Sequence, residues 1–157
     1  MQIYYTRYYR DTLGLPHWRK ALENRLEEEL IEAPRLEYAL NGKPPLAGQK
    51  FLDVGCGTGG MVWAAATKGF QAYGVEASPE ALDICRLKAN QIDVPHGHLK
   101  IGFAESLPFE DNVFDFVYSL SVLEHVQDVK KALSEMVRVT RPGGHHLHSF
   151  SHLFCVL

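Results

Sequence analysis

The sequence predicts an α/β fold with a parallel, Rossmann-like sheet, and two features support this prediction. From residue 50 onward, short apolar segments typical of strands alternate with segments of helical periodicity. The first apolar segment runs directly into a glycine-rich stretch, GCGTGG (Gly55–Gly60), and a helical pattern follows it. Strands separated by helices form parallel sheets through right-handed crossovers. The length of 157 residues fits a single domain.

Residues 1–46 are predicted to form a helical segment in front of an α/β core at residues 47–157. Aromatic and apolar positions in this segment recur every three or four residues: Tyr4, Tyr5, Tyr8, Tyr9, Leu15, Trp18, Leu22, Leu26 and Leu30. The tyrosines could form a lid over a bound ligand, but an amphipathic helix packed on the sheet accounts for the same spacing. Asn41–Gln49 contains two prolines and two glycines and is therefore predicted to be a linker.

Five strands are predicted in the core, at Phe51–Val54, Ala72–Glu76, Leu99–Phe103, Phe114–Ser119 and His145–Phe150. The helix after the glycine stretch should end near Lys68, because Gly69 favours a helix stop. Ser78 and Asp128 are suited to cap the helices that follow them. Pro142–Gly144 should end the last helix before the fifth strand begins.

The glycine stretch alone leaves two ligands open. Gly55, Gly57 and Gly60 match the G-x-G-x-x-G turn of dinucleotide-binding proteins, but LDVGCGTG also fits a site for S-adenosylmethionine. Glu76 ends the second strand roughly 20 residues later, where a carboxylate can accept hydrogen bonds from the ribose of either ligand. Asp53 favours S-adenosylmethionine, because its charge would repel a pyrophosphate and suits an ammonium and a sulfonium.

With these motifs in place, the chain resembles the class I S-adenosylmethionine-dependent methyltransferases, in particular the type 11-like group that acts on small molecules and lipids. Four stretches between Lys50 and Ser149 carry the resemblance in the order of the family: FLDVGCGTG, YGVEASPEAL, GFAESLPFEDNVFDFVYSLSVLEHV and EMVRVTRPGG. The resemblance implies a seven-stranded sheet with an antiparallel last strand. It also implies S-adenosyl-L-methionine as the cofactor and methyl transfer as the reaction.

The resemblance assigns the glycine loop to the methionine and ribose parts of the cofactor. Gly55, Cys56 and Gly57 would lie against these parts with their backbone, and the loop would extend to Gly59. Asp53 would steer the methionine ammonium, directly or through a water molecule. These roles come from the family and are predictions for this chain.

The same resemblance places the adenosine near the ends of the second and third strands. Glu76 would bind the ribose, Ala77 would lie beside the adenine, and Ala104 and Glu105 would meet the adenine edge. The family often has Asp before that Ala, whereas this chain has Phe103. A phenyl ring can stack on the base or wall it, but it cannot accept a hydrogen bond from the adenine amino group.

Residues after the fourth strand would face the methionine and the methyl acceptor. Ser119 and Leu120 occupy this place by resemblance. His125 is a weak candidate for a catalytic base, because its ordinary pKa suits proton removal, although such a histidine more often orients a loop. His146 and His148 share a face of the fifth strand, but no cysteine or carboxylate completes a metal site, so no metal is predicted.

Composition narrows the class of acceptor and partner. The net charge of −3, the pI near 6.2 and the lack of a Lys/Arg cluster argue against nucleic acid. SLSV (Ser119–Val122) stands where amino-methyltransferases of nucleic acids carry an Asn/Asp-Pro-Pro-aromatic motif. A small molecule or a lipid head group is therefore the predicted acceptor. No apolar run reaches about 18 residues, and three dispersed cysteines suit a reducing cytoplasm.

Two other functions stay open: a catalytically incomplete module that binds only the cofactor or a partner chain, and an NAD-dependent oxidoreductase. The sequence stops at Leu157, before the last two strands of the family, and its fifth strand is unusually polar for a strand buried on both faces. We expect a shortened sheet whose edge recruits a partner chain or forms a homodimer. Apolar residues would adjoin that edge: Leu153, Phe154, Val156 and Leu157.

Overall fold

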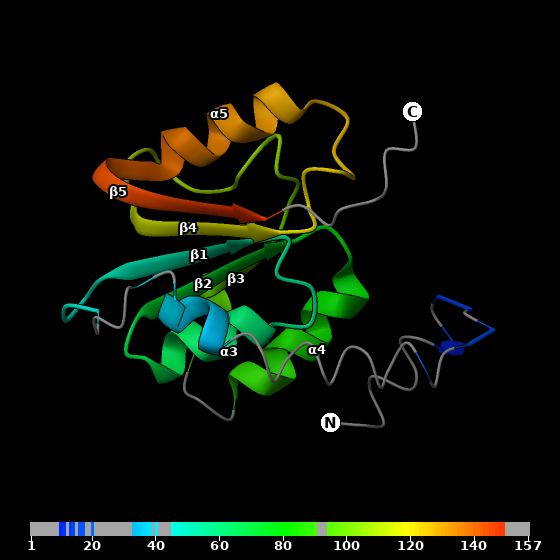
Figure 1. The fold of residues 1–157 in the computed structure, drawn as a ribbon. Coiled ribbons are helices and arrows are strands. Elements are labelled where there is room, and N and C mark those ends of the chain that lie inside the picture. Colours follow the sequence, from blue (N-terminus) through cyan, green and yellow to red (C-terminus); the bar gives the residue numbers. More distant parts are fainter. Residues whose placement is uncertain are drawn as a thin grey trace.

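The computed structural model describes residues 10–11, 13–14, 16–17, 20, 33–38, 40, 45–90 and 94–149. Its strands are β1 (Lys50–Val54), β2 (Gln71–Glu76), β3 (Leu99–Ile101), β4 (Phe114–Leu120) and β5 (Thr140–Ser149) (Figure 1). The helices that follow the first strand are α3 (Gly60–Thr67), α4 (Pro79–Ala89), the 3₁₀ turn η2 (His96–His98) and α5 (Val129–Val139).

The five strands form one sheet in the order β3-β2-β1-β4-β5, and every neighbouring pair is parallel. The chain moves outward from β1 to β3, then returns to β4 and moves outward in the other direction to β5. Right-handed crossovers therefore place α3 and α4 on one face of the sheet and α5 on the other, as Figure 1 shows. This arrangement confirms the predicted α/β, Rossmann-like fold.

Each face of the sheet has its own hydrophobic core. Phe51 of β1 belongs to the cluster beneath α3 and α4, together with Leu82 of α4. The next residue, Leu52, points to the opposite face and packs in the cluster that contains Met136 of α5. Successive side chains of a strand alternate between faces, so a central strand covered on both sides is mostly apolar. Residues 33–38 are helical and add Leu36, only 1% exposed, to the first cluster.

Three of the predicted helix ends are confirmed, whereas the predicted end of the last helix at Pro142–Gly144 is wrong, because α5 already ends at Val139. The Ser78 hydroxyl accepts a hydrogen bond from the Ala81 amide at 3.2 Å at the start of α4. The Asp128 carboxylate accepts a hydrogen bond from the Lys131 amide at 2.9 Å at the start of α5. Gly69 follows α3 with φ of 101°, a left-handed conformation that side chains rarely adopt.

The predicted start of the fifth strand at His145 is wrong. Helix α5 ends at Val139, and β5 begins at the next residue, before the Pro-Gly-Gly sequence. Phe114 pairs with Thr140 and Phe116 pairs with His145, so residues 141–144 form an irregular bulge against a single residue of β4. The bulge accommodates a proline and two glycines inside the strand. From the sequence pattern alone, these three residues are expected to lie between the helix and the strand.

Several predictions concern residues outside the described set. The aromatic positions among residues 1–9, most of the predicted N-terminal helix and the apolar residues 153–157 belong there. Of the predicted linker, residues 45–49 are described and form turns and irregular chain before β1. Within the described ranges, no helix is long and apolar enough to cross a membrane.

Candidate functional site

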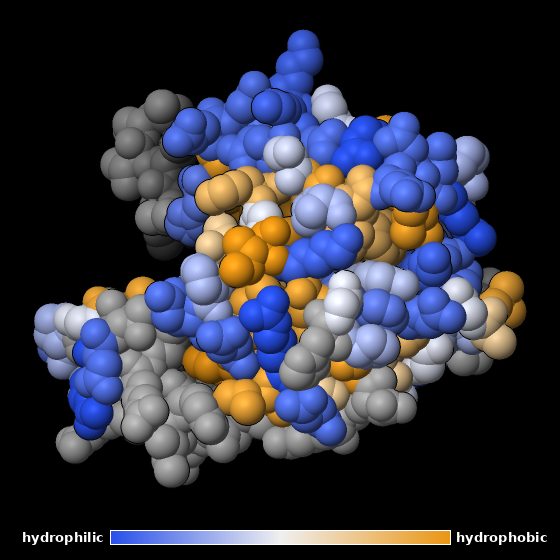
Figure 2. All heavy atoms as spheres, turned by 180° about the vertical axis from the view of Figure 1, so that it is seen from behind, coloured by the Kyte–Doolittle hydropathy of each residue, from blue (hydrophilic) through white to orange (hydrophobic). Residues whose placement is uncertain are grey.

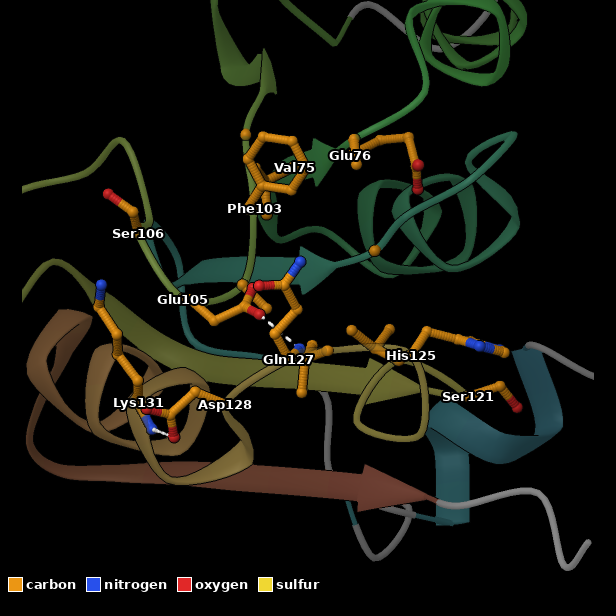
Figure 3. Close-up of a pocket in the computed structure, with 16 residues that line it drawn as sticks. Val75, Glu76, Phe103, Glu105, Ser106, Ser121, His125, Gln127, Asp128 and Lys131 are labelled. Atoms are coloured by element: carbon orange, nitrogen blue, oxygen red, sulfur yellow. Dashed lines mark hydrogen bonds between the residues drawn. The ribbon is translucent and has the colours of Figure 1, made fainter.

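A cavity of about 780 Å³ opens at the carboxyl ends of the strands, beside the N-terminus of α5 (Figure 3). This edge of a parallel α/β sheet is where ligands bind, near the point where the strand order reverses. The following residues line it: Gly55, Val75, Glu76, Ala77, Gly102, Phe103, Ala104, Glu105, Ser106, Ser121, Val122, His125, Val126, Gln127, Asp128 and Lys131. Figure 2 shows the molecule from behind, with apolar side chains gathered across the middle of the face below a hydrophilic band.

The glycine loop after β1 is fixed to the second strand. The amides of Gly55 and Cys56 both donate to the Val75 carbonyl, at 2.8 and 3.0 Å. Gly55 has φ of 72°, and a Cβ added there would lie 2.4 Å from a methyl carbon of Val122. Only glycine permits both this backbone conformation and this close approach. The loop is therefore held against the wall of the cavity by packing as well as by hydrogen bonds.

Glu76 braces the glycine loop from the end of β2. One of its carboxylate oxygens accepts from the Gly57 amide at 2.9 Å, and the other accepts from the Ser78 amide at 2.8 Å. A carboxylate offers about four acceptor sites, so each oxygen keeps capacity for a ligand hydroxyl. The sequence predicts Glu76 as a ligand-binding residue, but its second function, holding the loop, depends on contacts that only the fold creates.

The loops after β3 and β4 are tied together across the cavity. A carboxylate oxygen of Glu105 accepts from the Gln127 amide at 2.9 Å, the contact drawn as a dashed line in Figure 3. Hydrogen bonds from backbone amides, those of Glu105 itself and of Gln127 first, lower the pKa of the Glu105 carboxyl. Lys131 contributes its charge to the same shift. Glu105 is thus an ionised brace between two walls.

Phe103 stands at the rim of the cavity and is 64% exposed. The predicted strand reaches Phe103, but β3 ends at Ile101. Beyond it, the Gly102 amide still donates to the Glu76 carbonyl at 3.1 Å, and the Ser106 amide donates to the Phe103 carbonyl at 3.0 Å. These bonds fix the backbone that presents the phenyl ring at the rim of the cavity (Figure 3).

Helix α5 clamps the loop that carries this rim. Glu135 accepts from the Leu107 amide at 2.9 Å and pairs with the guanidinium of Arg138 at 2.7 Å. Arg138 also donates to Asp111 at 2.7 Å and to the carbonyls of Phe109 and Leu107 at 2.9 and 3.1 Å. The hydrogen bond from Arg138 is the main cause that lowers the pKa of Glu135. The ion pairs therefore hold the loop after β3 in place.

A comparison with known families identifies the family of this chain. Residues 52–148 match the family described as the methyltransferase domain, which covers more than half of the chain. The chain belongs to the class I S-adenosylmethionine-dependent methyltransferases. This finding confirms the family that the four sequence stretches predict.

Three similar proteins show the range of the family. A ubiquinone biosynthesis O-methyltransferase of Alkalilimnicola ehrlichii is 34% identical over 133 residues, which cover 81% of this chain and 54% of that protein. A norajmaline N-methyltransferase of Rauvolfia serpentina is 37% identical over 103 residues, with coverages of 64% and 35%. The structure of Haemonchus contortus phosphoethanolamine N-methyltransferase 2 in complex with S-adenosyl-L-methionine is 30% identical, with a TM-score of 0.62 and coverages of 72% and 26%. The methyltransferase chain thus spans about half of the first relative and less of the others.

The cavity brings together part of the predicted site. The predicted residues that line it are Gly55, Glu76, Ala77, Ala104, Glu105 and His125. The predicted residues that do not line it are Asp53, Cys56, Gly57, Gly59, Ser119 and Leu120. Among these, Asp53 is 4% exposed and Ser119 is 1% exposed, and the Ser119 hydroxyl lies 2.8 Å from Nδ1 of His148. The roles predicted for the residues of both groups stay predictions.

Sequence reasoning missed most of the wall after β4. Val122 and Val126 lie in a stretch that carries the family resemblance, but no role was predicted for them. Gln127 and Lys131 lie outside the four stretches, and Asp128 is recognisable only as a helix cap. A sequence signal was available for Asp128 and Lys131, because a helix N-terminus at the carboxyl edge of the sheet commonly faces a ligand. In the part of the chain that the structure describes, no three His, Cys, Asp or Glu side chains group as metal ligands would.

Proposed function

We propose that this methyltransferase domain binds S-adenosylmethionine in the cavity at the carboxyl ends of the strands and transfers its methyl group to a small-molecule acceptor. One observation supports this proposal most strongly. The Glu76 carboxylate sits at the junction of the glycine loop and the cavity, oriented by the amides of Gly57 and Ser78. Ribose hydroxyls are the hydrogen-bond donors that such a carboxylate suits.

The remaining subsites follow from the neighbours of Glu76. The purine would lie beside Ala77, between the Phe103–Glu105 segment and the loop at residues 125–128. The methionine part would follow the backbone of the glycine loop toward the end of β4, with buried Asp53 supplying negative charge beneath it. When bound, the sulfonium supplies an activated methyl group. The protein then contributes alignment and the exclusion of water.

His125 is the candidate group for removing a proton from the acceptor. Its ring extends toward Ser121 at the end of the cavity next to β4 (Figure 3), on the side away from Glu105. An acceptor hydroxyl or ammonium needs such a base, whereas an acceptor with a free lone pair does not. His125→Ala should therefore lower turnover and leave cofactor affinity unchanged. Loss of cofactor affinity in this variant would assign His125 a binding role instead.

The relatives support small acceptors of more than one type. They are named for O-methylation in ubiquinone biosynthesis, for N-methylation of norajmaline and for N-methylation of phosphoethanolamine. We propose a phenolic hydroxyl or an amine as the methylated group in this protein. Transfer of a labelled methyl group into a catechol, a secondary amine and phosphoethanolamine tests this. Robust methylation of tRNA or DNA without small-molecule activity would contradict it.

The predicted partner chain and the cytoplasmic location both stay predictions. Strand β5 is the last in the sheet order, and among the described strands only β4 pairs with it. Edge strands present unpaired backbone groups to other chains, so a homodimer or a partner at β5 is the expected consequence. Sedimentation at several concentrations measures this, and a concentration-independent monomer would contradict it.

Calorimetric titration with S-adenosylhomocysteine and then with NAD separates the proposed function from the dinucleotide alternative. We expect saturable binding of S-adenosylhomocysteine at one site and no heat change from NAD. Binding of NAD alone would overturn the proposed function. Binding of S-adenosylhomocysteine without methyl transfer to any acceptor would favour a module that only binds the cofactor.

A further inference from the structure

Two histidine side chains of β5 project from the same face of the sheet, because one residue separates them in the strand. The ring centroids of His146 and His148 lie 5.5 Å apart. In the register with β4 these residues lie opposite Val117 and Ser119, on the face that α5 covers. Strand β5 is the last in the sheet order, and among the described strands it pairs only with β4 (Figure 1). The two rings therefore lie beside an edge of the sheet.

The two rings are spaced as ligands of one zinc ion would be. Zinc binds imidazole nitrogens at about 2.0–2.1 Å in tetrahedral sites, which places the centroids of two bound rings about 5 Å apart. Nδ1 of His148 lies 2.8 Å from the hydroxyl oxygen of Ser119. A histidine that binds a metal through one ring nitrogen commonly donates a hydrogen bond from the other. Ser119 can accept that bond, which leaves Nε2 of His148 for the ion, and His146 is exposed to solution.

A structural zinc site needs four protein ligands, and this pair supplies two of them. The described residues contain no group of three or more metal ligands, so the described part of one chain does not complete the site. We infer that His146 and His148 form half of a zinc site, which a second copy of this chain completes at the β5 edge. The inference goes beyond methyl transfer and rests on the β5 contact proposed above. When two β5 strands pair antiparallel about Leu147, His146 of each chain lies opposite His148 of the other, and opposite residues share a face of the sheet.

The exposed flank of α5 supports a second copy as the occupant of this edge. Glu135 and Arg138 hold the loop after β3, so they mark the flank of α5 on the side of the central strands. Successive helix residues are rotated by about 100°, and positions that follow the buried Ala132 and Met136 therefore lie on the other flank, toward β5. Three apolar side chains recur there every four residues and are 42%, 36% and 63% exposed: Val129, Leu133 and Val137. Pairing of two β5 edges brings the apolar flanks of both copies to the same face as the four imidazoles.

Sedimentation equilibrium of the unmodified protein in zinc chloride, in magnesium chloride and in EDTA tests the inference. Saturating zinc should lower the dissociation constant of the dimer by about tenfold or more, because an ion that binds only the dimer shifts the equilibrium toward it. Calorimetric titration should find one zinc ion for every two chains. Magnesium should have no effect, since it prefers oxygen ligands.

Two variants of neighbouring histidines separate this site from nonspecific binding of zinc. His146→Ala should remove the zinc effect, and the exposed position of this side chain makes the variant compatible with folding. His145→Ala is the matched control, because the ring of His145 lies on the opposite face, with its centroid 4.9 Å from that of Phe116. This variant should keep the full zinc effect.

Several outcomes would overturn the inference. A zinc effect of equal size in His146→Ala, or zinc bound by a chain that stays monomeric, would exclude the shared site. A dimer of equal strength in zinc and in EDTA would also exclude it, while leaving the proposed β5 contact intact. A monomer under all conditions would overturn both. Binding of S-adenosylhomocysteine to the same samples tests the proposed cofactor site separately, and it should be the same for His146→Ala and the unmodified protein.

Discussion

Replacing Gly55 by alanine should destabilise the protein far more than the same change at Gly57. Both residues have positive φ, 72° and 51°, so each alanine costs about 1–2 kcal/mol of backbone strain. A Cβ at Gly55 also lies 2.4 Å from Cγ2 of Val122, whereas a Cβ at Gly57 meets nothing within 4 Å. Overpacking of this kind adds about 1–3 kcal/mol. Gly55→Ala should therefore cost about 2–5 kcal/mol and Gly57→Ala about 1–2 kcal/mol.

Urea denaturation followed by circular dichroism measures both free energies of unfolding. Val122→Ala supplies a second test, because it removes the methyl carbon that the new Cβ would meet. In the Gly55→Ala background it should recover part of the lost stability, although it costs stability by itself. Equal destabilisation by the two glycine variants, or strict additivity of Gly55→Ala and Val122→Ala, would refute the reasoning.

Two further predictions concern the clamp between α5 and the loop after β3. Arg138→Met should lower the free energy of unfolding by about 2 kcal/mol, because Glu135 and Asp111 lose their charged partner; thermal denaturation measures this, and an unchanged midpoint would contradict it. The second prediction concerns pH. The pKa of Glu135 is lower in the folded protein than in the unfolded chain, so its contribution to stability is present above about pH 4.3 and is lost as the pH falls through the folded value. Glu135→Gln should therefore be less stable than the parent at neutral pH and show a shallower loss of stability on acidification; parallel pH profiles would disprove this role.

The central strands and the helix caps were predictable from local sequence. Phe51 and Leu52 are apolar because β1 is buried on both faces, and Ser78 and Asp128 act within one turn of their own helices. The early start of β5 was not predictable in this way. Pro142–Gly144 would break a regular strand, and the bulge that accommodates it is defined only by the register with β4.

In the candidate site, too, local sequence predicts some residues but not the contacts between residues that are far apart in the chain. Glu76 and Gly55 could be identified because their spacing from the strand ends is a local property of the chain. The braces made by Glu76 to Gly57 and by Glu105 to Gln127 could not, since they join residues 19 and 22 positions apart. Contacts at that separation depend on how the strands are ordered in the sheet. The contacts of Arg138 with the loop after β3 depend on the strand order in the same way, so they could not be predicted from local sequence either.

Calorimetric titration of S-adenosylhomocysteine into the unmodified protein and into Glu76→Ala is the most direct test of the proposed cofactor site. Glu110→Ala is the matched control, because Glu110 is exposed and does not line the cavity. We predict saturable binding to the unmodified protein and to Glu110→Ala. Binding to Glu76→Ala should be weaker by about 1.5–3 kcal/mol, the contribution of hydrogen bonds to a charged group. Absence of binding to the unmodified protein, or equal affinity in Glu76→Ala, would contradict the assignment of this cavity to S-adenosylmethionine.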